Sequence, residues 1–184
     1  MPHFDEHYFK TIQSCGERLA DDLAGLLRRA VSGRGHALVA VSGGHTPQYV
    51  FPALSRADLP WRHVGVTLSD ERWVGIDHPD SNEGLVRRLL LQGPAAAATF
   101  TRLKSPYADP FSGHRETEAQ LAALNWPLDA VFLGMGEDGH IASLFPGDDQ
   151  GLTAPGRVLA VAASGGRLPR ISLSAGTLLE SRHI

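Results

Sequence analysis

The sequence predicts an α/β fold in which a mostly parallel, Rossmann-like sheet lies between helices in a three-layer αβα arrangement. Apolar runs at 37–41, 64–69 and 130–133 have the length of buried strands and are bounded by turn residues. Amphipathic segments separate these runs, an alternation typical of a parallel sheet with helices on both faces. Each run leads into a polar or glycine-rich turn. We therefore expect these turns to meet at the carboxyl edge of the sheet, where open α/β sheets bind their ligands.

The composition is that of one ordinary globular domain. Hydrophobic residues make up 42% and charged residues 20% of the 184-residue chain, and neither a linker nor an internal repeat divides it. The single cysteine, Cys15, excludes an intrachain disulfide and disfavours a cysteine-rich metal site.

The charge and hydropathy patterns argue against several classes of partner. A net charge of -3 supplies no basic field for nucleic acid. No apolar run approaches the ~20 residues that a membrane-spanning helix needs, and the N-terminus lacks the basic and apolar regions of a signal peptide. We therefore expect a cytosolic protein with neither a nucleic-acid nor a membrane partner. A monomer or weak homodimer is a separate expectation, which these patterns do not test.

Further elements follow from apolar spacing and turn residues. Residues 5–31 carry an apolar stripe at three- and four-residue steps and are predicted to form one long helix. Residues 93–112 are predicted to be a surface connection that includes, at most, a short strand at 99–103. The remaining predicted elements are helices beginning at Ser81 or Asn82, at 114–124 and near Ala175, and strands at 158–162 and 170–174.

The segment SGGHTP at 42–47 joins the first strand to a predicted helix over 47–55. Free N–H groups of a glycine turn and the positive end of a helix dipole form a cradle for phosphate, to which Ser42 and Thr46 can add hydroxyl donors. The GxxxxGK[ST] and GxGxxG spacings are both absent. A plain strand-to-helix turn with Thr46 as N-cap is an equally good interpretation of the local pattern.

Three charged residues, Asp70-Glu71-Arg72, follow the strand 64–69. Charged side chains at the end of a buried strand are costly unless they are paired or used. Arg72 is able to hold a phosphate or carboxylate through two parallel hydrogen bonds. A surface ion pair between Asp70 and Arg72 is the alternative interpretation.

The strand 130–133 leads into a turn containing Glu137, Asp138 and several glycines, and His140 follows. An imidazole beside carboxylates at a strand end predicts acid–base chemistry. Asp138 either orients this imidazole or caps the following segment, IASLF, which is predicted to be a helix ended by Pro146. The histidines show neither HxH nor HExxH spacing, so a metal site is disfavoured.

Arg170 opens the strand 170–174 after a turn rich in glycine and proline. It is a second candidate for phosphate binding, and an exposed cation at a strand edge is the alternative.

Four motifs stand in this order along the chain: SGGHTP at 42–47, SDERWV at 69–74, LGMGEDGHIASLFPG at 133–147 and RISLS at 170–174. Together they resemble the 6-phosphogluconolactonases, and the chain is identified as a member of the glucosamine-6-phosphate isomerase/6-phosphogluconolactonase family. The segment DHPDSN at 77–82 also fits. The resemblance covers nearly the whole chain. It implies the sheet and sugar-phosphate loop of glucosamine-6-phosphate deaminase and ribose-5-phosphate isomerase.

The resemblance also implies a reaction and a role for each motif. The reaction is hydrolysis of 6-phospho-D-glucono-1,5-lactone to 6-phosphogluconate in the oxidative pentose phosphate pathway, with no cofactor and no metal. His140 would be the general base with Asp138 beside it, and Asp70 and Arg72 would lie beside the substrate. Arg72 would contact the anionic end or the lactone oxygens. The phosphate would be bound by Ser42, Gly43, Gly44, Thr46 and Arg170.

Two departures from the family pattern leave alternatives open. His45 stands where a small hydroxyl residue is expected, and family members usually continue beyond this length with a further strand and a final helix. We therefore expect residues 1–184 to form a single sugar-phosphate-binding domain that lacks those two elements. A sugar-phosphate isomerase or deaminase on the same fold, or a catalytically silent sugar-phosphate sensor, are the alternative functions.

Overall fold

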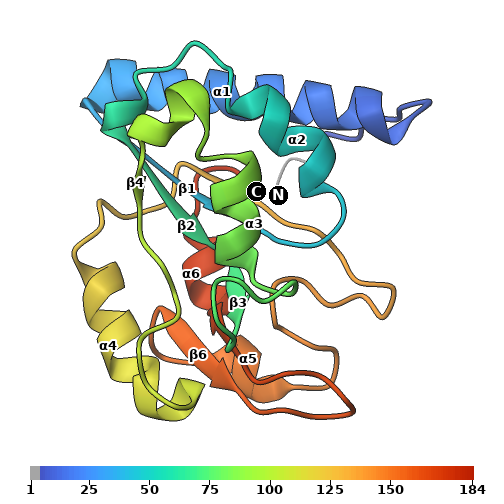
Figure 1. Ribbon diagram of the computed structural model, residues 1–184, viewed down its shortest axis with the longest axis vertical. Helices are drawn as coiled ribbons and strands as arrows, with labels where there is room; N and C mark the ends of the chain where they lie inside the picture. Colours follow the sequence, from blue (N-terminus) through green and yellow to red (C-terminus); the bar gives the residue numbers. More distant parts are fainter. Residues whose placement is uncertain (1–4) are drawn as a thin grey trace.

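The computed structural model describes residues 5–184, and its first sheet has the predicted parallel arrangement (Figure 1). The strand order is β4-β2-β1-β5. The strands are β1 (Ala37–Val41), β2 (Val64–Leu68), β4 (Thr99–Phe100) and β5 (Ala130–Phe132). Ala37 of β1 pairs with Val64 of β2, and Val41 with Leu68. All five residues of β1 are buried, as expected for a central strand that is covered on both faces.

A second, antiparallel sheet has the order β3-β7-β6. Its strands are β3 (Asp70–Arg72), β6 (Val158–Val161) and β7 (Arg170–Leu173). Asp70–Arg72 were expected at the end of the strand 64–69 and not in a strand of their own, and the two later strands were not separated from the parallel sheet. Apolar runs indicate strands without indicating their partners, so the second sheet was not predicted.

Ser69 joins the two sheets. Its N–H donates to the carbonyl oxygen of Val41 over 2.9 Å, and its own carbonyl accepts the N–H of Leu173 over 2.8 Å. Strand β2 therefore continues into β3 with only this residue between them. The polar residues of β3 are thereby held at the carboxyl edge of the parallel sheet.

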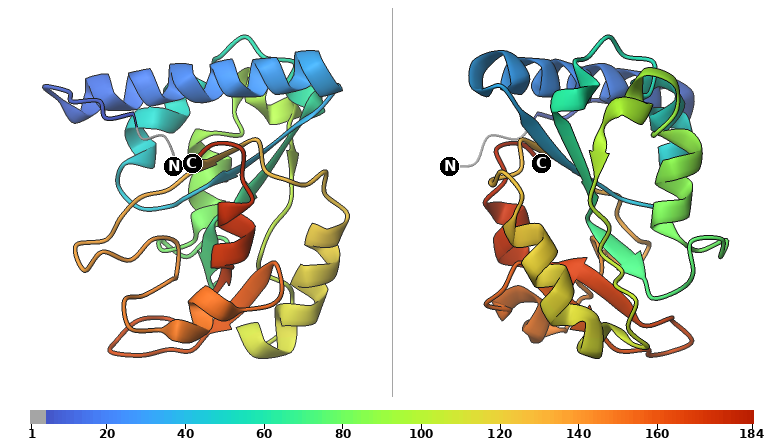
Figure 2. Two further views of the ribbon diagram at one scale, coloured as in Figure 1. Left: turned by 180° about the vertical axis from the view of Figure 1, so that it is seen from behind. Right: turned by 60° about the vertical axis from the view of Figure 1, so that its left-hand side comes forward.

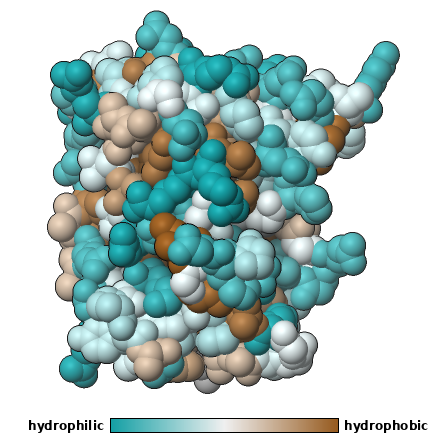
Figure 3. Space-filling view, viewed as in Figure 1, coloured by the Kyte–Doolittle hydropathy of each residue, from teal (hydrophilic) through white to brown (hydrophobic). Residues whose placement is uncertain are grey.

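The helices lie on both sides of the sheets, which gives the predicted layered α/β architecture. Helix α3 is in front of the strands in Figure 1, and α6 is in front when the molecule is seen from behind in Figure 2. The face in Figure 3 is mostly hydrophilic, with smaller apolar areas. The helices are α1 (Ile12–Arg34), α2 (Pro47–Leu54), α3 (Asn82–Leu89), α4 (Pro110–Ala122), α5 (Asp149–Thr153) and α6 (Ala175–Leu179), with 3₁₀ turns at Trp61–His63 and Gly93–Ala97.

Two helices begin at other residues than predicted. Helix α1 begins at Ile12 instead of residue 5, because the Thr11 side chain accepts the N–H of Ser14 and caps the helix there. Helix α4 begins at Pro110, inside the segment predicted to be a surface connection. The Asp109 carboxylate accepts the N–H groups of the first turn, and Pro110 occupies the first helical position, where its missing N–H costs nothing.

The helix predicted for IASLF after His140 is wrong. Ile141 instead forms isolated β-bridges with Met135 and Leu144, and Ala142 has a positive φ of 49°. The N–H of Gly136 donates to the carbonyl oxygen of His140 over 2.8 Å. The backbone groups of this segment are paired across the loop, so it remains a closed loop and the next helix, α5, begins only at Asp149.

One buried apolar core runs through both sheets and includes residues of α1, α2, α3, α4 and α6. Helix α1 buries the face formed by Ala20, Leu23 and Leu27, as its apolar stripe predicted. Within residues 5–184, no helix combines the length and the hydrophobicity that crossing a membrane requires.

Candidate active site

A cleft of about 260 Å³ lies where the carboxyl ends of β1, β2 and β5 meet the antiparallel sheet. Ligands of open α/β sheets bind at such an edge. Every residue predicted for the site lines this cleft except Asp138, which contacts one of the lining side chains. The lining residues named by the sequence analysis are Ser42, Gly43, Gly44, Thr46, Asp70, Arg72, His140 and Arg170.

The loop after β1 presents its backbone to the cleft. Gly44 has a φ of 95°, a conformation that favours glycine. Ser42 is buried, and its hydroxyl lies 2.7 Å from that of Ser69. Thr46 stands at the N-cap position of α2 but makes no side-chain capping hydrogen bond. Thr46 is thus the N-cap residue, as the alternative interpretation had it, but without a capping side-chain bond. Among residues 5–184 its hydroxyl has no capping partner, which leaves it able to contact a ligand at the positive end of the helix dipole.

Arg72 and Arg170 face each other across the β3–β7 pair. Like charges directly opposite each other on neighbouring strands are destabilising. In the part of the chain that the structure describes, the Nε atoms of both arginines are buried and have no hydrogen-bond partner. Burial lowers the pKa of Arg170, and the charge of Arg72 acts in the same direction. A bound anion would offset the repulsion and accept the unpaired N–H groups.

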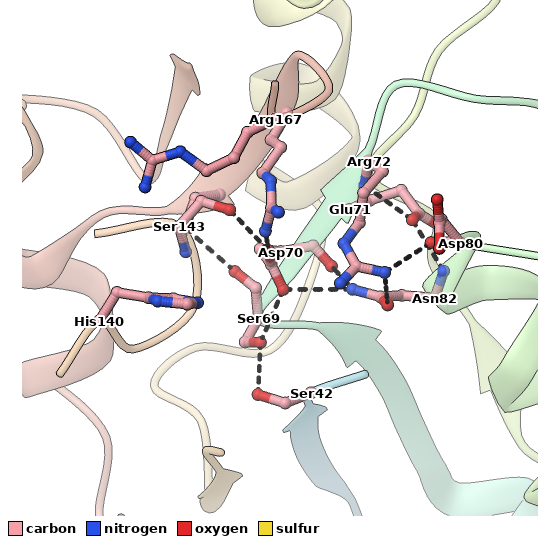
Figure 4. Close-up of polar contacts among 12 residues, drawn as sticks. Ser42, Ser69, Asp70, Glu71, Arg72, Asp80, Asn82, His140, Ser143 and Arg167 are labelled. Carbon is pink, nitrogen blue, oxygen red and sulfur yellow. Dashed lines mark hydrogen bonds and ion pairs between the residues drawn. The ribbon is translucent and has the colours of Figure 1, made fainter. Parts of the chain in front are cut away.

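Asp70 is buried, and both of its carboxylate oxygens are engaged. Oδ2 accepts the hydroxyl of Ser143 over 2.6 Å and lies 3.5 Å from Nη1 of Arg170. Oδ1 accepts the side-chain amide of Asn82 over 3.2 Å. In Figure 4, Arg72 and His140 lie on either side of this residue. Asp70 therefore anchors Arg170 and the surrounding hydrogen bonds at the floor of the cleft.

His140 forms a side-chain pair with Asp138, whose Oδ1 contacts the imidazole Nδ1. This hydrogen bond holds the pKa of Asp138 below its usual value. The imidazole also packs against Phe145, with 4.8 Å between the ring centroids. Within residues 5–184, Nε2 of His140 makes no hydrogen bond, and this side chain lines the cleft. Asp138 thus orients the ring, as one of the two sequence-based interpretations proposed, and leaves Nε2 available as a base.

Gly136 leaves the space that the imidazole fills. A methyl group built on Gly136 would overlap the His140 ring. We expect Gly136→Ala to displace the ring. The kcat of a reaction that uses this imidazole as a base should then fall at least about tenfold, because small displacements of catalytic groups lower rates by this factor or more. The measurement is kcat together with the melting temperature. Gly75→Ala is the control, since a methyl group there meets nothing within 4 Å. An unchanged kcat in Gly136→Ala would show that the ring position does not matter.

Several residues at the site were not predicted. Ser143 binds Asp70, although its segment was taken for a helix. Asn82 was considered only as a helix cap, and it contacts Asp70 and Arg72. Arg167 lies over the Phe145 ring, 3.9 Å from its centroid, and lines a neighbouring cleft of about 330 Å³ together with Arg170. The sequence did carry a signal for Arg167, because it is a second arginine in the glycine turn, three residues before Arg170.

The geometry defines the class of site before any comparison. Two neighbouring arginines and a glycine turn at a helix N-terminus suit a small anionic ligand, and an imidazole–carboxylate pair beside them suits proton transfer. Within residues 5–184, no three His, Cys, Asp or Glu side chains are grouped so that they would hold a metal ion.

A family model described as Glucosamine-6-phosphate isomerases/6-phosphogluconolactonase matches residues 10–184. The chain belongs to this family.

Individual relatives agree with this assignment. A 6-phosphogluconolactonase from Pseudomonas aeruginosa is 46% identical over 149 residues, which cover 81% of this chain and 60% of the relative. A 6-phosphogluconolactonase from Rhizobium meliloti is 39% identical over 183 residues, which cover 97% of this chain and 79% of the relative. The chain thus spans 60% and 79% of the length of these two curated relatives.

Solved structures share the fold. A 6-phosphogluconolactonase from Shewanella baltica superposes with a TM-score of 0.91 at 38% identity, covering 95% of this chain and 76% of that one. A monomeric glucosamine-6-phosphate deaminase superposes with a TM-score of 0.77 at 17% identity, covering 95% of this chain and 78% of that one. The predicted resemblance to the fold of the deaminase is therefore confirmed.

Proposed function

We propose that this chain hydrolyses 6-phospho-D-glucono-1,5-lactone to 6-phosphogluconate, in the oxidative pentose phosphate pathway, by general-base activation of water. The observation that carries the proposal is the juxtaposition, in one cleft, of the Arg72–Arg170 pair and the free Nε2 of His140. The substrate is taken from the relatives named 6-phosphogluconolactonase. The expected cytosolic location and the expected state of monomer or weak homodimer belong to the same proposal.

The phosphate is bound at one end of the cleft. Backbone N–H groups of Gly43 and Gly44, the Thr46 hydroxyl and the positive end of α2 supply donors, and Arg170 supplies a charge. Asp70 holds Arg170 in place. Fixing the phosphate at a distance from the carbonyl fixes the lactone ring for attack, which converts part of the entropic cost of the reaction into binding.

The reaction takes place beside His140. Nε2 removes a proton from a water molecule, whose oxygen attacks the lactone carbonyl carbon, and the carbonyl electron pair moves onto its oxygen. When the tetrahedral intermediate collapses, the ring C–O bond breaks and the imidazolium returns its proton to the leaving oxygen. Arg72 or backbone N–H groups of the glycine turns stabilise the oxyanion, a contribution that is usually larger than proton transfer. Asp138 keeps the imidazole oriented throughout.

A substrate comparison tests this function against its alternatives. The lactone is generated in place from glucose 6-phosphate, and acid formation is followed above the spontaneous rate. We expect acid formation from the lactone and no turnover of glucosamine 6-phosphate or ribose 5-phosphate. Turnover of either of the latter compounds, with none of the lactone, would favour the isomerase or deaminase. Binding of 6-phosphogluconate without any hydrolysis would favour the silent sensor.

A further inference from the structure

We propose that Glu71 and Asn82 are positioning residues: Glu71 fixes the start of α3, and Asn82, the first residue of that helix, fixes Asp70 and Arg72 in the cleft. The inference rests on the proposed function, whose mechanism gives neither residue a role. Both residues are buried, with exposed fractions of 1% for Glu71 and 2% for Asn82.

The position of Glu71 in β3 directs its side chain away from the cleft. Successive side chains of a strand point to opposite faces, so Asp70 and Arg72 share one face and Glu71 takes the other. There its Oε1 accepts the backbone N–H of Asn82 over 2.8 Å, and its Oε2 accepts that of Glu83 over 2.7 Å. These are N–H groups of the first turn of α3, which have no partner within the helix.

The bonds to Glu71 hold a carboxylate in a place where burial opposes its charge. Burial raises the pKa of Glu71, while the backbone N–H groups of Glu83, Asn82 and Arg72 act in the opposite direction. The hydroxyl of Ser81 is a further donor to Oε2, at 3.3 Å. Two acceptor oxygens are therefore matched to four donors, a pattern that a neutral carboxamide is unable to reproduce.

Asn82 connects the start of α3 to three parts of the cleft. Its Nδ2 donates to the carbonyl oxygen of Asp70 over 2.8 Å and to Oδ1 of the same residue over 3.2 Å. Its Oδ1 accepts Nη1 of Arg72 over 3.3 Å. It also packs against Gly43 so closely that a methyl group on that glycine would overlap the carboxamide. Figure 4 shows the Asn82 side chain beside Asp70 and next to the guanidinium group of Arg72. A displacement of Asn82 would therefore be passed to the phosphate loop, to Asp70 and to Arg72.

The test compares Glu71→Gln, Asn82→Ala and the double variant. We expect each single variant to lower kcat about 10- to 100-fold, since small displacements of catalytic groups have effects of this size. The kcat of the double variant should be no more than about threefold below that of the less active single variant. The reason is that the effects of two substitutions in one chain of contacts do not add. Multiplication of the two losses would overturn the proposal. If Glu71→Gln does not fold, Asn82→Ala decides the question by its own kcat.

Glu83→Gln is the matched control. Glu83 is also buried and also stands in the first turn of α3, but its carboxylate pairs with Arg87 at 2.9 Å and Arg102 at 3.5 Å, and it does not line the cleft. We expect a lower melting temperature with kcat within about twofold of the wild type, as for an additive change remote from the site. A fall in kcat equal to that of Glu71→Gln would mean that only the stability of α3 matters, and would overturn the proposal.

A second readout separates this inference from the proposed function. The Nε–H of Arg72 is buried and should give a resolved signal in a ¹H–¹⁵N spectrum of the free protein, assigned by its loss in Arg72→Lys. We expect this signal to shift or broaden in Glu71→Gln and Asn82→Ala and to stay in place in Glu83→Gln. An unmoved signal in the first two variants would overturn the positioning role. Absence of lactone hydrolysis by the wild type would overturn the proposed function alone, and the spectra would still decide this inference.

Discussion

Replacing His140 with alanine is expected to lower kcat for lactone hydrolysis about 10²–10⁴-fold, the usual contribution of a positioned general base. The affinity for 6-phosphogluconate should change by no more than about threefold, because proton transfer stabilises the transition state and not the bound product. The physical basis is the free Nε2 of His140 beside the arginine pair, with Nδ1 held by Asp138. Steady-state kinetics and calorimetric titration measure the two quantities.

Glu137→Gln is the control for the His140 variant. Glu137 is an exposed carboxylate of the same turn, does not line the cleft, and is the carboxylate adjacent to Asp138 in sequence. Its replacement removes one negative charge from this turn and leaves the contact between Asp138 and the imidazole in place. We expect kcat to stay within about twofold, as for surface substitutions away from special features. A His140→Ala enzyme with wild-type kcat would eliminate His140 as the base.

The second large effect is expected for Arg170→Met. Removing one partner of a buried charge pair typically costs at least about 2 kcal/mol, so 6-phosphogluconate should bind at least about 30-fold more weakly. Arg170 is largely buried, with a side-chain exposure of 14%, and its unpaired Nε–H is one of the donors that the ligand would satisfy. Titration with 6-phosphogluconate measures the affinity, and urea unfolding measures the stability.

The stability of this variant carries a second expectation. Without Arg170, the buried carboxylate of Asp70 loses its ion-pair partner, which we expect to lower the free energy of unfolding by about 1–3 kcal/mol. Adding Asp70→Asn should recover part of that stability and none of the affinity. Arg170→Lys keeps the charge and should bind more tightly than Arg170→Met. Unchanged affinity in Arg170→Met would show that the phosphate is bound elsewhere.

Most of the parallel sheet was predictable, because β1, β2 and β5 are continuous apolar runs that end in turn residues. The run ALVAV at 37–41 has the same bounds as β1, since a strand that is buried on both faces is apolar at every position. The antiparallel sheet was not predictable in the same way. It begins after Ser69, whose backbone bonds to both sheets, and the local sequence carries no signal for this change of partner.

Site residues were predictable where they lie in a short motif at the end or the start of a strand. His140 and Asp138 are two residues apart and form a pair, and Arg72 and Arg170 each belong to a polar motif at a strand. Asn82 was not predictable, because its function depends on contacts with Asp70 and Arg72, which are 12 and 10 residues away in sequence, respectively. The loop after His140 was mistaken for a helix because its apolar spacing fits both structures.

A crystal structure of the chain with 6-phosphogluconate bound would show directly whether His140 and Arg170 have the roles proposed for them. We expect the phosphate against the loop at 42–46 and Arg170, and the carboxylate carbon on the side of His140, within about 3–3.5 Å of a water held by Nε2. A phosphate bound beside His140, or a ligand bound outside the cleft, would contradict these roles.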